Sequence, residues 1–316
     1  MRALRTAAAL SAAAIGLAAL ALWRSDIPFA ALRARYAGPD SRFLRLPDGT
    51  LLHVRDIGRR DGPVLLCLHG YSASSLDWLP WAHALATDAR LLLVDLPGHG
   101  LTEAPAHQPH GTDAMASAVV ALTGVLGLDK VVLVGNSMGG QVALTAALAM
   151  PERVAGLVLI APTGAIDLRA SAPPSPLFRL LASKAGRWVL RHLDLTMLVR
   201  RGLRDALGDP AMVTDDLVAR TAALARAPGH RAILTELQLA PGGEPLLGRL
   251  GALRQPALVI AGEADRLVPV SASRAIAAAL PASRLVVYDG VGHVPMLTTP
   301  ARCAADVRDW LETAVR

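Results

Sequence analysis

Hydrophobic residues form two patterns along this chain, alternating and continuous, and each predicts a different kind of strand. Arg42–Leu46 and Leu51–Asp56 alternate between apolar and polar positions around Asp48-Gly49, a pattern typical of a β-hairpin. Farther along, hydrophobicity becomes continuous in short runs, at Val64–His69, Arg90–Asp95, Lys130–Gly135, Val154–Ala161, Ala257–Gly262 and Arg284–Tyr288. Continuous runs indicate strands that are covered on both faces, as in a parallel sheet.

Most of these runs are separated by segments of helical length and period. The predicted helices are Asp77–Thr87, Thr112–Leu126, Met138–Met150, Ser271–Leu280 and Pro300–Val315. Alternating strands and helices predict an α/β fold with a mostly parallel, doubly wound sheet.

The alternation stops between Asp167 and about Leu250. This block contains amphipathic helical stretches at Leu177–Leu193, Met197–Leu207 and Asp215–Ala227, without a convincing strand. We therefore predict a helical cap at 167–250, inserted between two parts of one core at 42–166 and 251–316.

The first 24 residues differ in kind from the rest. Arg2 and Arg5 precede Thr6–Trp23, which carries no charge and would span roughly 27 Å as a helix. The segment predicts a cell-membrane location through a single anchor at 1–24, with the remainder exported and near the membrane surface. The alternative is secretion after cleavage near Ala19-Leu20-Ala21. Residues 25–41 are predicted to be a polar connector.

Charge and cysteine usage exclude several classes of function. The net charge is +6, but no basic run exceeds two residues and aromatic residues make up only 3% of the chain, so no nucleic-acid surface is predicted. Cys67 lies in an apolar run and Cys303 in a predicted helix. Both are expected to be small buried residues, and neither belongs to a metal-ligand cluster.

The candidate nucleophile is Ser137, in Gly135-Asn136-Ser137-Met138-Gly139. An apolar strand runs directly into this Gly-x-Ser-x-Gly sequence, and a helical pattern follows it. Such a tight strand–turn–helix transition strains the serine backbone and exposes its hydroxyl, so Gly135 and Gly139 are expected on either side for steric reasons.

A serine hydroxyl needs a base, and the base needs an acid that orients it. His293 follows the last predicted strand and is the candidate base. Asp265 follows strand Ala257–Gly262 at the same edge of the sheet. Glu263 and Asp289 are rivals for the acid, but the order Ser…Asp…His favours Asp265.

Acyl transfer also requires N–H donors for a developing oxyanion. The amide of Met138, after the nucleophile, is one candidate, and the amide of Tyr71 is the other. Gly70 would let the backbone turn close to Ser137, and His69 is expected to brace this loop. The turn Asp95–Gly100 is interpreted as structural support.

Five sequences in order resemble those of the α/β-hydrolase superfamily: His69-Gly70, Asp95–Gly100, Gly135–Gly140, Gly262–Asp265 and Gly292–Pro295. The resemblance covers about Arg42 to Arg316. It implies an α/β-hydrolase fold and a serine hydrolase that cleaves small-molecule or lipid-like carboxylic esters without a metal or organic cofactor. The alternatives are a C–C bond hydrolase of ring-cleavage products and a non-catalytic ligand-binding member. Because C–C hydrolases usually have a more glycine-rich oxyanion loop, the stretch His69–Ser74 counts against them.

Overall fold

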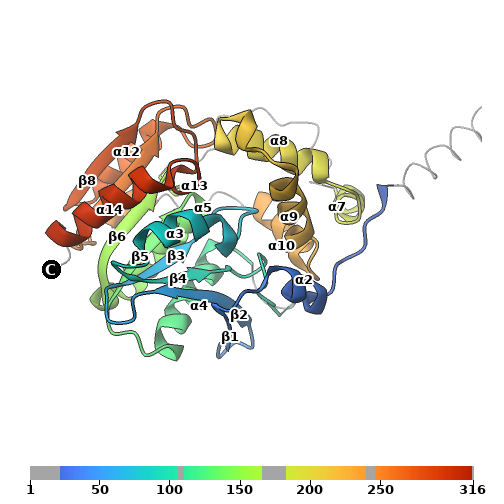
Figure 1. The fold of residues 1–316 in the computed structure, drawn as a ribbon, viewed down its shortest axis with the longest axis horizontal. Helices are drawn as coiled ribbons and strands as arrows, with labels where there is room; N and C mark the ends of the chain where they lie inside the picture. The colour runs from blue at the N-terminus through green and yellow to red at the C-terminus, as the bar shows by residue number, and fades with distance from the viewer. Residues whose placement is uncertain (1–21, 106–109, 166–182, 240–245, 315–316) are drawn as a thin grey trace, which may run out of the picture.

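The computed structural model describes residues 22–105, 110–165, 183–239 and 246–314, and an eight-stranded sheet forms its centre (Figure 1). The strands are β1 (Ser41–Arg45), β2 (Leu51–Gly58), β3 (Val64–Leu68), β4 (Arg90–Val94), β5 (Val131–Asn136), β6 (Val154–Ile160), β7 (Ala257–Gly262) and β8 (Ser283–Tyr288). Their order is β1-β2-β4-β3-β5-β6-β7-β8. Only β2 runs antiparallel to its neighbours β1 and β4, and the other pairs are parallel. The predicted hairpin and the mostly parallel α/β architecture are confirmed.

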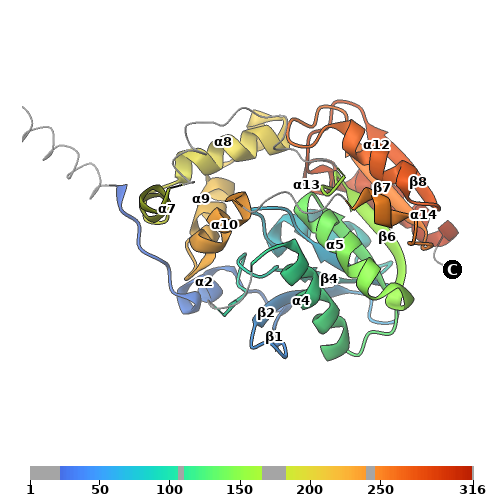
Figure 2. The same cartoon turned by 180° about the vertical axis from the view of Figure 1, so that it is seen from behind.

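Helices cover both faces of the sheet (Figures 1 and 2). One face carries α3 (Leu79–Leu85) and α14 (Pro300–Ala314), and the other carries α4 (Thr112–Val125), α5 (Met138–Ala149) and α12 (Val270–Ala279). Side chains of β3 alternate between the two cores: Leu65 and Cys67 face α3 and α14, whereas Leu66 faces α4 and α5. This double burial explains why the strands have continuous apolar sequences.

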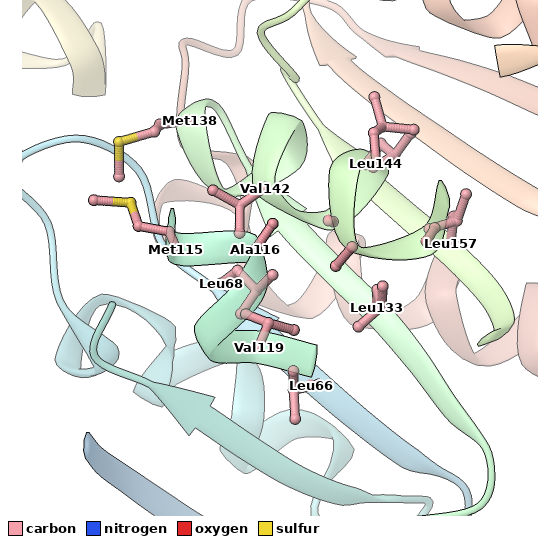
Figure 3. Close-up of a cluster of buried hydrophobic side chains, with 14 of the residues drawn as sticks. Leu66, Leu68, Met115, Ala116, Val119, Leu133, Met138, Val142, Leu144 and Leu157 are labelled. Atoms are coloured by element: carbon pink, nitrogen blue, oxygen red, sulfur yellow. The ribbon is translucent and has the colours of Figure 1, made fainter. Parts of the chain in front are cut away.

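The core between the sheet and helices α4 and α5 fixes the start of α5. Figure 3 shows Met115 and Val119 of α4 and Val142 of α5 gathered over the leucines of β3 and β5. Met138, the first residue of α5, is itself part of this cluster and is 7% exposed. Burying each such side chain stabilises the fold by about 1.5–3 kcal/mol. The turn between β5 and α5 is therefore held between two well-packed elements.

The described elements between β6 and β7 are all helical. They are α7 (Lys184–Leu190), α8 (Thr196–Leu207), the 3₁₀ turn η3 (Pro210–Met212), α9 (Asp215–Ala225), α10 (His230–Leu239) and α11 (Leu247–Leu250). Helices α7 to α10, which we call the cap, lie together beyond one end of the sheet (Figures 1 and 2). The described part of the predicted helix Leu177–Leu193 contains α7, and the other two predicted cap helices correspond to α8 and α9, whereas α10 had no counterpart. Residues 166–182 and 240–245 of the predicted insertion lie outside the described residues, and its bounds stay a prediction.

Shorter helical segments complete the core. These are η1 (Ser75–Trp78), η2 (Pro151–Arg153) and α13 (Pro295–Thr298). The predicted helix Asp77–Thr87 is thus shared between η1 and α3.

The connector predicted at 25–41 contains a helix, α2 (Phe29–Tyr36), that its polar sequence did not indicate. Leu32 of this helix is only 2% exposed and packs with Leu101 and with Leu224 of α9. In Figure 1 the dark blue chain runs from α2 past α9 toward α7. The connector is therefore part of the wall of the folded body.

The predicted membrane location is corrected by the structure. Within the four described ranges, no helix is long and apolar enough to cross a bilayer. The single anchor predicted at 1–24 is therefore not supported, and residues 1–21 of it lie outside the described residues; secretion is not shown either. Trp23, the last residue of the uncharged run, stacks on His192 of the cap, with ring centroids 4.4 Å apart.

Candidate active site

Ser137 stands at the sharp turn between β5 and α5. Its backbone has φ 54° and ψ −119°, a left-handed conformation that residues with a side chain rarely adopt. A Cβ on Gly135 would lie 2.3 Å from the Gly139 carbonyl oxygen, and a Cβ on Gly139 would lie 2.1 Å from that of Leu68. The turn therefore has no room for larger residues on either side of the serine, as the sequence pattern predicts.

His293 and Asp265 meet on two loops that follow β8 and β7. The His293 Nδ1 and Asp265 Oδ2 atoms are 2.7 Å apart, and the two side chains are only 6% and 1% exposed. The other Asp265 oxygen, Oδ1, accepts hydrogen bonds from the amides of Leu267 (2.8 Å) and Val268 (2.9 Å). The carboxylate is thus fixed in orientation, and Nδ1–H donation to it leaves the Nε2 lone pair of His293 free to accept a proton.

The rival carboxylates lie elsewhere. Glu263 is fully exposed, and a hydrogen bond with Asp289 together with the charge of that residue raises the pKa of Glu263. The structure therefore places these two side chains against each other, whereas Asp265 contacts the histidine ring.

One cavity brings the remaining candidates together. It has a volume of about 960 Å³, and Ser137, His293, Gly70 and Tyr71 all lie on its wall. A Cβ on Gly70 would come within 3.3 Å of the Ser137 Cβ, so the loop after β3 passes directly beside the serine. The volume of the cavity falls within the range of small-molecule sites, about 300–1,000 Å³.

The two expected oxyanion donors belong to segments that adjoin Ser137, the start of α5 and the loop after β3. Met138 is the first residue of α5, where a helical amide has no intrahelical acceptor. Tyr71 follows Gly70, and its hydroxyl donates to the Leu234 carbonyl of α10 at 3.0 Å. The loop after β3, which carries the expected Tyr71 donor and which we call the oxyanion loop for that expected role, is therefore tied to the cap as well as to the core.

His69 fixes this loop through two hydrogen bonds to backbone atoms. Its Nδ1–H donates to the Gly70 carbonyl at 2.8 Å, and its Nε2 accepts from the Leu96 amide at 3.0 Å. Burial lowers the pKa of His69, which keeps the ring neutral. Because both ring nitrogens bind backbone atoms, the geometry suits a brace rather than a second base.

Comparison with known proteins places this architecture in a family. Residues 63–300 match the family described as "alpha/beta hydrolase fold". The chain belongs to the α/β-hydrolase family. The comparisons thereby support a hydrolase, as the sequence motifs imply.

Three relatives show how varied the activities of similar α/β hydrolases are. The chain is 34% identical to a pimeloyl-[acyl-carrier protein] methyl ester esterase of Xanthomonas campestris, over 78% of this chain and 93% of that one. It is 30% identical to a 2-hydroxy-6-oxononadienedioate/2-hydroxy-6-oxononatrienedioate hydrolase of Klebsiella pneumoniae, over 80% and 89%. Among solved structures, a bacterial membrane phospholipase A superposes with a TM-score of 0.72 at 26% identity, over 99% of this chain and 98% of that one.

The α/β hydrolase also contains a site residue to which the sequence analysis gave no role. The Asn136 side-chain amide donates to the carbonyls of Ile160 and His293, each at 3.1 Å. It thereby joins the end of β5 to the loop that carries the histidine. Its position directly before the serine was the available signal, but the partners are distant in sequence.

A second Ser–His–Asp chain lies in the same α/β hydrolase. The Ser41 hydroxyl is 2.8 Å from His53 Nε2, and His53 Nδ1 is 2.7 Å from Asp95 Oδ2. Although burial alone would raise the pKa of Asp95, the charge and hydrogen bond of His53 outweigh it and lower that pKa. Asp95 also accepts from the amides of Ser75 and Leu101. None of the three lies on the wall of the cavity as the described residues define it, so we interpret this chain as a structural brace.

Proposed function

We propose that this α/β hydrolase is a serine hydrolase that cleaves carboxylic esters through an acyl-enzyme. Ser137 is the nucleophile, His293 the base and Asp265 the residue that orients the base. The observation that supports this assignment best is that Ser137 shares a cavity with His293, whose ring is held at 2.7 Å by a buried carboxylate.

The reaction follows from these positions. The Ser137 hydroxyl attacks the ester carbonyl carbon while His293 Nε2 takes its proton, and the oxyanion accepts hydrogen bonds from the amides of Met138 and Tyr71. The alcohol then leaves with the proton from His293. A water molecule attacks the acyl-enzyme with His293 as base, which releases the acid and restores the serine.

The cavity wall favours an ester with an apolar part. Most of the cap side chains that face the cavity are aliphatic, among them Leu195, Leu198, Val199, Leu203, Val218 and Leu234. The names of two similar proteins, a methyl ester esterase and a phospholipase A, are consistent with a small-molecule or lipid-like ester. We therefore expect medium or long acyl chains to be better substrates than acetate.

A fluorophosphonate probe tests the nucleophile directly. The wild-type chain should be labelled, and Ser137→Ala should remove the labelling and lower kcat on a nitrophenyl ester by up to about 10⁶-fold. The matched control is Ser41→Ala, because Ser41 is also hydrogen-bonded to a histidine that contacts an aspartate. It should leave labelling intact.

Other outcomes would replace the proposal. Labelling that survives in Ser137→Ala would refute the nucleophile. An unlabelled wild-type protein that still binds esters would indicate a non-catalytic member of the family. Turnover of a 2-hydroxy-6-oxo-dienoate with negligible ester hydrolysis would indicate the C–C bond reaction instead.

A further inference from the structure

Three arginines gather where the N-terminal connector borders the cavity. Arg24 directly precedes the connector, Arg226 follows α9, and Arg231 lies in the first turn of α10. All three line the same cavity as Ser137 and His293. The pKa of Arg226 is lowered by burial and by the charges of Arg231 and Arg24, which reflects how closely the three lie. We call these residues the arginine cluster.

The cluster has fewer carboxylates than guanidinium groups. Arg24 pairs with Asp194 at 3.0 Å, and Arg231 pairs with Asp26 at 2.6 Å. Arg226 forms no ion pair within the described ranges and donates from Nε and Nη2 to the Ser25 carbonyl. Three positive and two negative charges leave one positive charge without a counterpart at the cavity wall.

The arginine cluster also contains a buried hydrogen-bond donor that has no acceptor among the described residues. Arg231 is 8% exposed, and its two terminal nitrogens bind the Arg24 carbonyl and Asp26. Its Nε is buried and has no hydrogen-bond partner among the described residues. A buried N–H without an acceptor costs about 1–3 kcal/mol. A ligand that brings an acceptor to this N–H would recover that free energy on binding.

Backbone hydrogen bonds hold the cluster in place. The amide of Arg24 donates to the His192 carbonyl at 2.7 Å, and the amide of Ile27 donates to the Arg226 carbonyl at 2.8 Å. Figures 1 and 2 both place this connector beyond α9 and α10 from α5, which carries the nucleophile at its start. The charges are therefore pre-organised at the part of the cavity wall that the N-terminal segment and the ends of α9 and α10 form.

We propose that the arginine cluster binds an anionic group, a carboxylate or a phosphate, at the end of the substrate remote from the ester. Guanidinium groups are weakly hydrated and form paired hydrogen bonds with planar or tetrahedral oxyanions. The aliphatic side chains that line the same cavity would hold an apolar spacer. This inference rests on the proposed ester hydrolysis and specifies its substrate class: esters with an apolar chain that ends in an anion.

Matched substrate pairs test the inference. Monomethyl esters of linear dicarboxylic acids are compared with methyl esters of monocarboxylic acids of the same chain length, over a range of lengths. At the best length we expect kcat/KM to favour the anionic ester at least about tenfold, mainly through KM. A third series with a terminal phosphate distinguishes the two anions.

Arginine variants locate the effect. In Arg226→Gln the preference should fall to about one, and turnover of the neutral ester shows that the variant is folded. Arg226→Lys keeps the charge and should keep at least a third of the preference. Arg201→Gln, at the cavity wall on α8, should keep most of it, and Arg249→Gln on α11, outside the cavity, should change nothing. Loss of preference in Arg201→Gln but not in Arg226→Gln would overturn the location.

A binding measurement separates this inference from the proposed chemistry. Calorimetry of the Ser137→Ala full chain with the best anionic half-ester should give a Kd that Arg226→Gln weakens at least about tenfold. If no ester is cleaved by the wild type but this binding remains, the proposed function fails and the anion site stands. Equal binding of anionic and neutral esters, or binding unaffected by Arg226→Gln, would overturn the anion site.

Discussion

Replacing Asp265 with asparagine should almost abolish catalysis while leaving the protein folded. Asp265 Oδ1 accepts two backbone N–H groups, from Leu267 and Val268, whereas Oδ2 contacts His293 Nδ1. An asparagine at this position must keep its side-chain carbonyl toward those two N–H groups. If the NH₂ group faced them instead, each backbone N–H would lose its acceptor, at a cost of about 1–3 kcal/mol each. The NH₂ group then faces His293 Nδ1, which must become an acceptor. The ring proton moves to Nε2, which can no longer take the proton of Ser137.

The expected magnitudes separate activity from stability. The wrong histidine tautomer lowers kcat by about 10⁴-fold in serine proteases, and we expect the same order here, equivalent to about 5 kcal/mol of activation free energy. All three hydrogen bonds remain possible but now involve a neutral amide in place of a carboxylate, so the free energy of unfolding should fall by only about 1–3 kcal/mol.

The assay is nitrophenyl ester hydrolysis by Asp265→Asn, with chemical denaturation of the same sample. The matched controls are Glu263→Gln and Asp289→Asn, two nearby acidic residues that contact each other. Both should keep kcat within about threefold of the wild type. If Asp265→Asn retained more than a tenth of kcat, or if Asp289→Asn lost as much activity, the assigned role of Asp265 would be refuted.

Two further predictions concern stability. Gly139→Ala should lower the free energy of unfolding by about 3 kcal/mol or more, since its Cβ would lie 2.1 Å from the Leu68 carbonyl oxygen; Gly248→Ala on α11, with open space around it, should be neutral or stabilising in the same denaturation assay. Acid should destabilise the fold below about pH 6.5, because burial lowers the pKa of both His69 and His99, so the unfolded chain binds more protons there. The contribution of the two neutral histidines to the free energy of unfolding is fully present above that pH. As the pH drops toward their pKa values in the folded state, this free energy falls by up to about 1.4 kcal/mol per pH unit for each histidine. Denaturation at pH 5, 6 and 7 measures the slope, which His99→Phe should reduce; an equal slope in that variant would contradict the assignment.

The sheet could be predicted because its cause is local. Each parallel strand is buried on both faces, so its sequence must be apolar throughout, and β3 and β7 follow the predicted runs to within a residue at each end. The Ser137 turn is partly local, since a side chain on Gly135 would meet the Gly139 carbonyl within the same turn, whereas a side chain on Gly139 would meet the Leu68 carbonyl of the distant strand β3. The approach of Asp265 to His293 could be expected only from the order of the strands.

The parts that sequence missed depend on contacts between distant segments. Helix α2 lies in a segment that was interpreted as a polar connector, and it is stabilised by Leu32 against α9, nearly two hundred residues away. Trp23 shows the same limit of local sequence, because an aromatic residue after an apolar stretch suits a membrane interface and a packed cap equally well, and in the structure it stacks on His192. Asn136 and the arginine cluster likewise acquire their partners only in the folded chain.

The cap is hydrogen-bonded to the loops that carry the proposed base and the proposed Tyr71 oxyanion donor, as well as lining the cavity. The amide of His293 donates to the Ala206 carbonyl at the end of α8 at 2.9 Å, and the Tyr71 hydroxyl donates to the Leu234 carbonyl of α10. Arg220 of α9 pairs with Asp77 of η1, directly after the oxyanion loop. A displacement of the cap would therefore shift the base and the oxyanion loop together. Because a ligand that fills the cavity holds these same helices in place, the energy of binding its remote end can be used to align the reacting groups. Filling the cavity should then raise kcat as well as lower KM, which distinguishes a coupled cap from a passive cover.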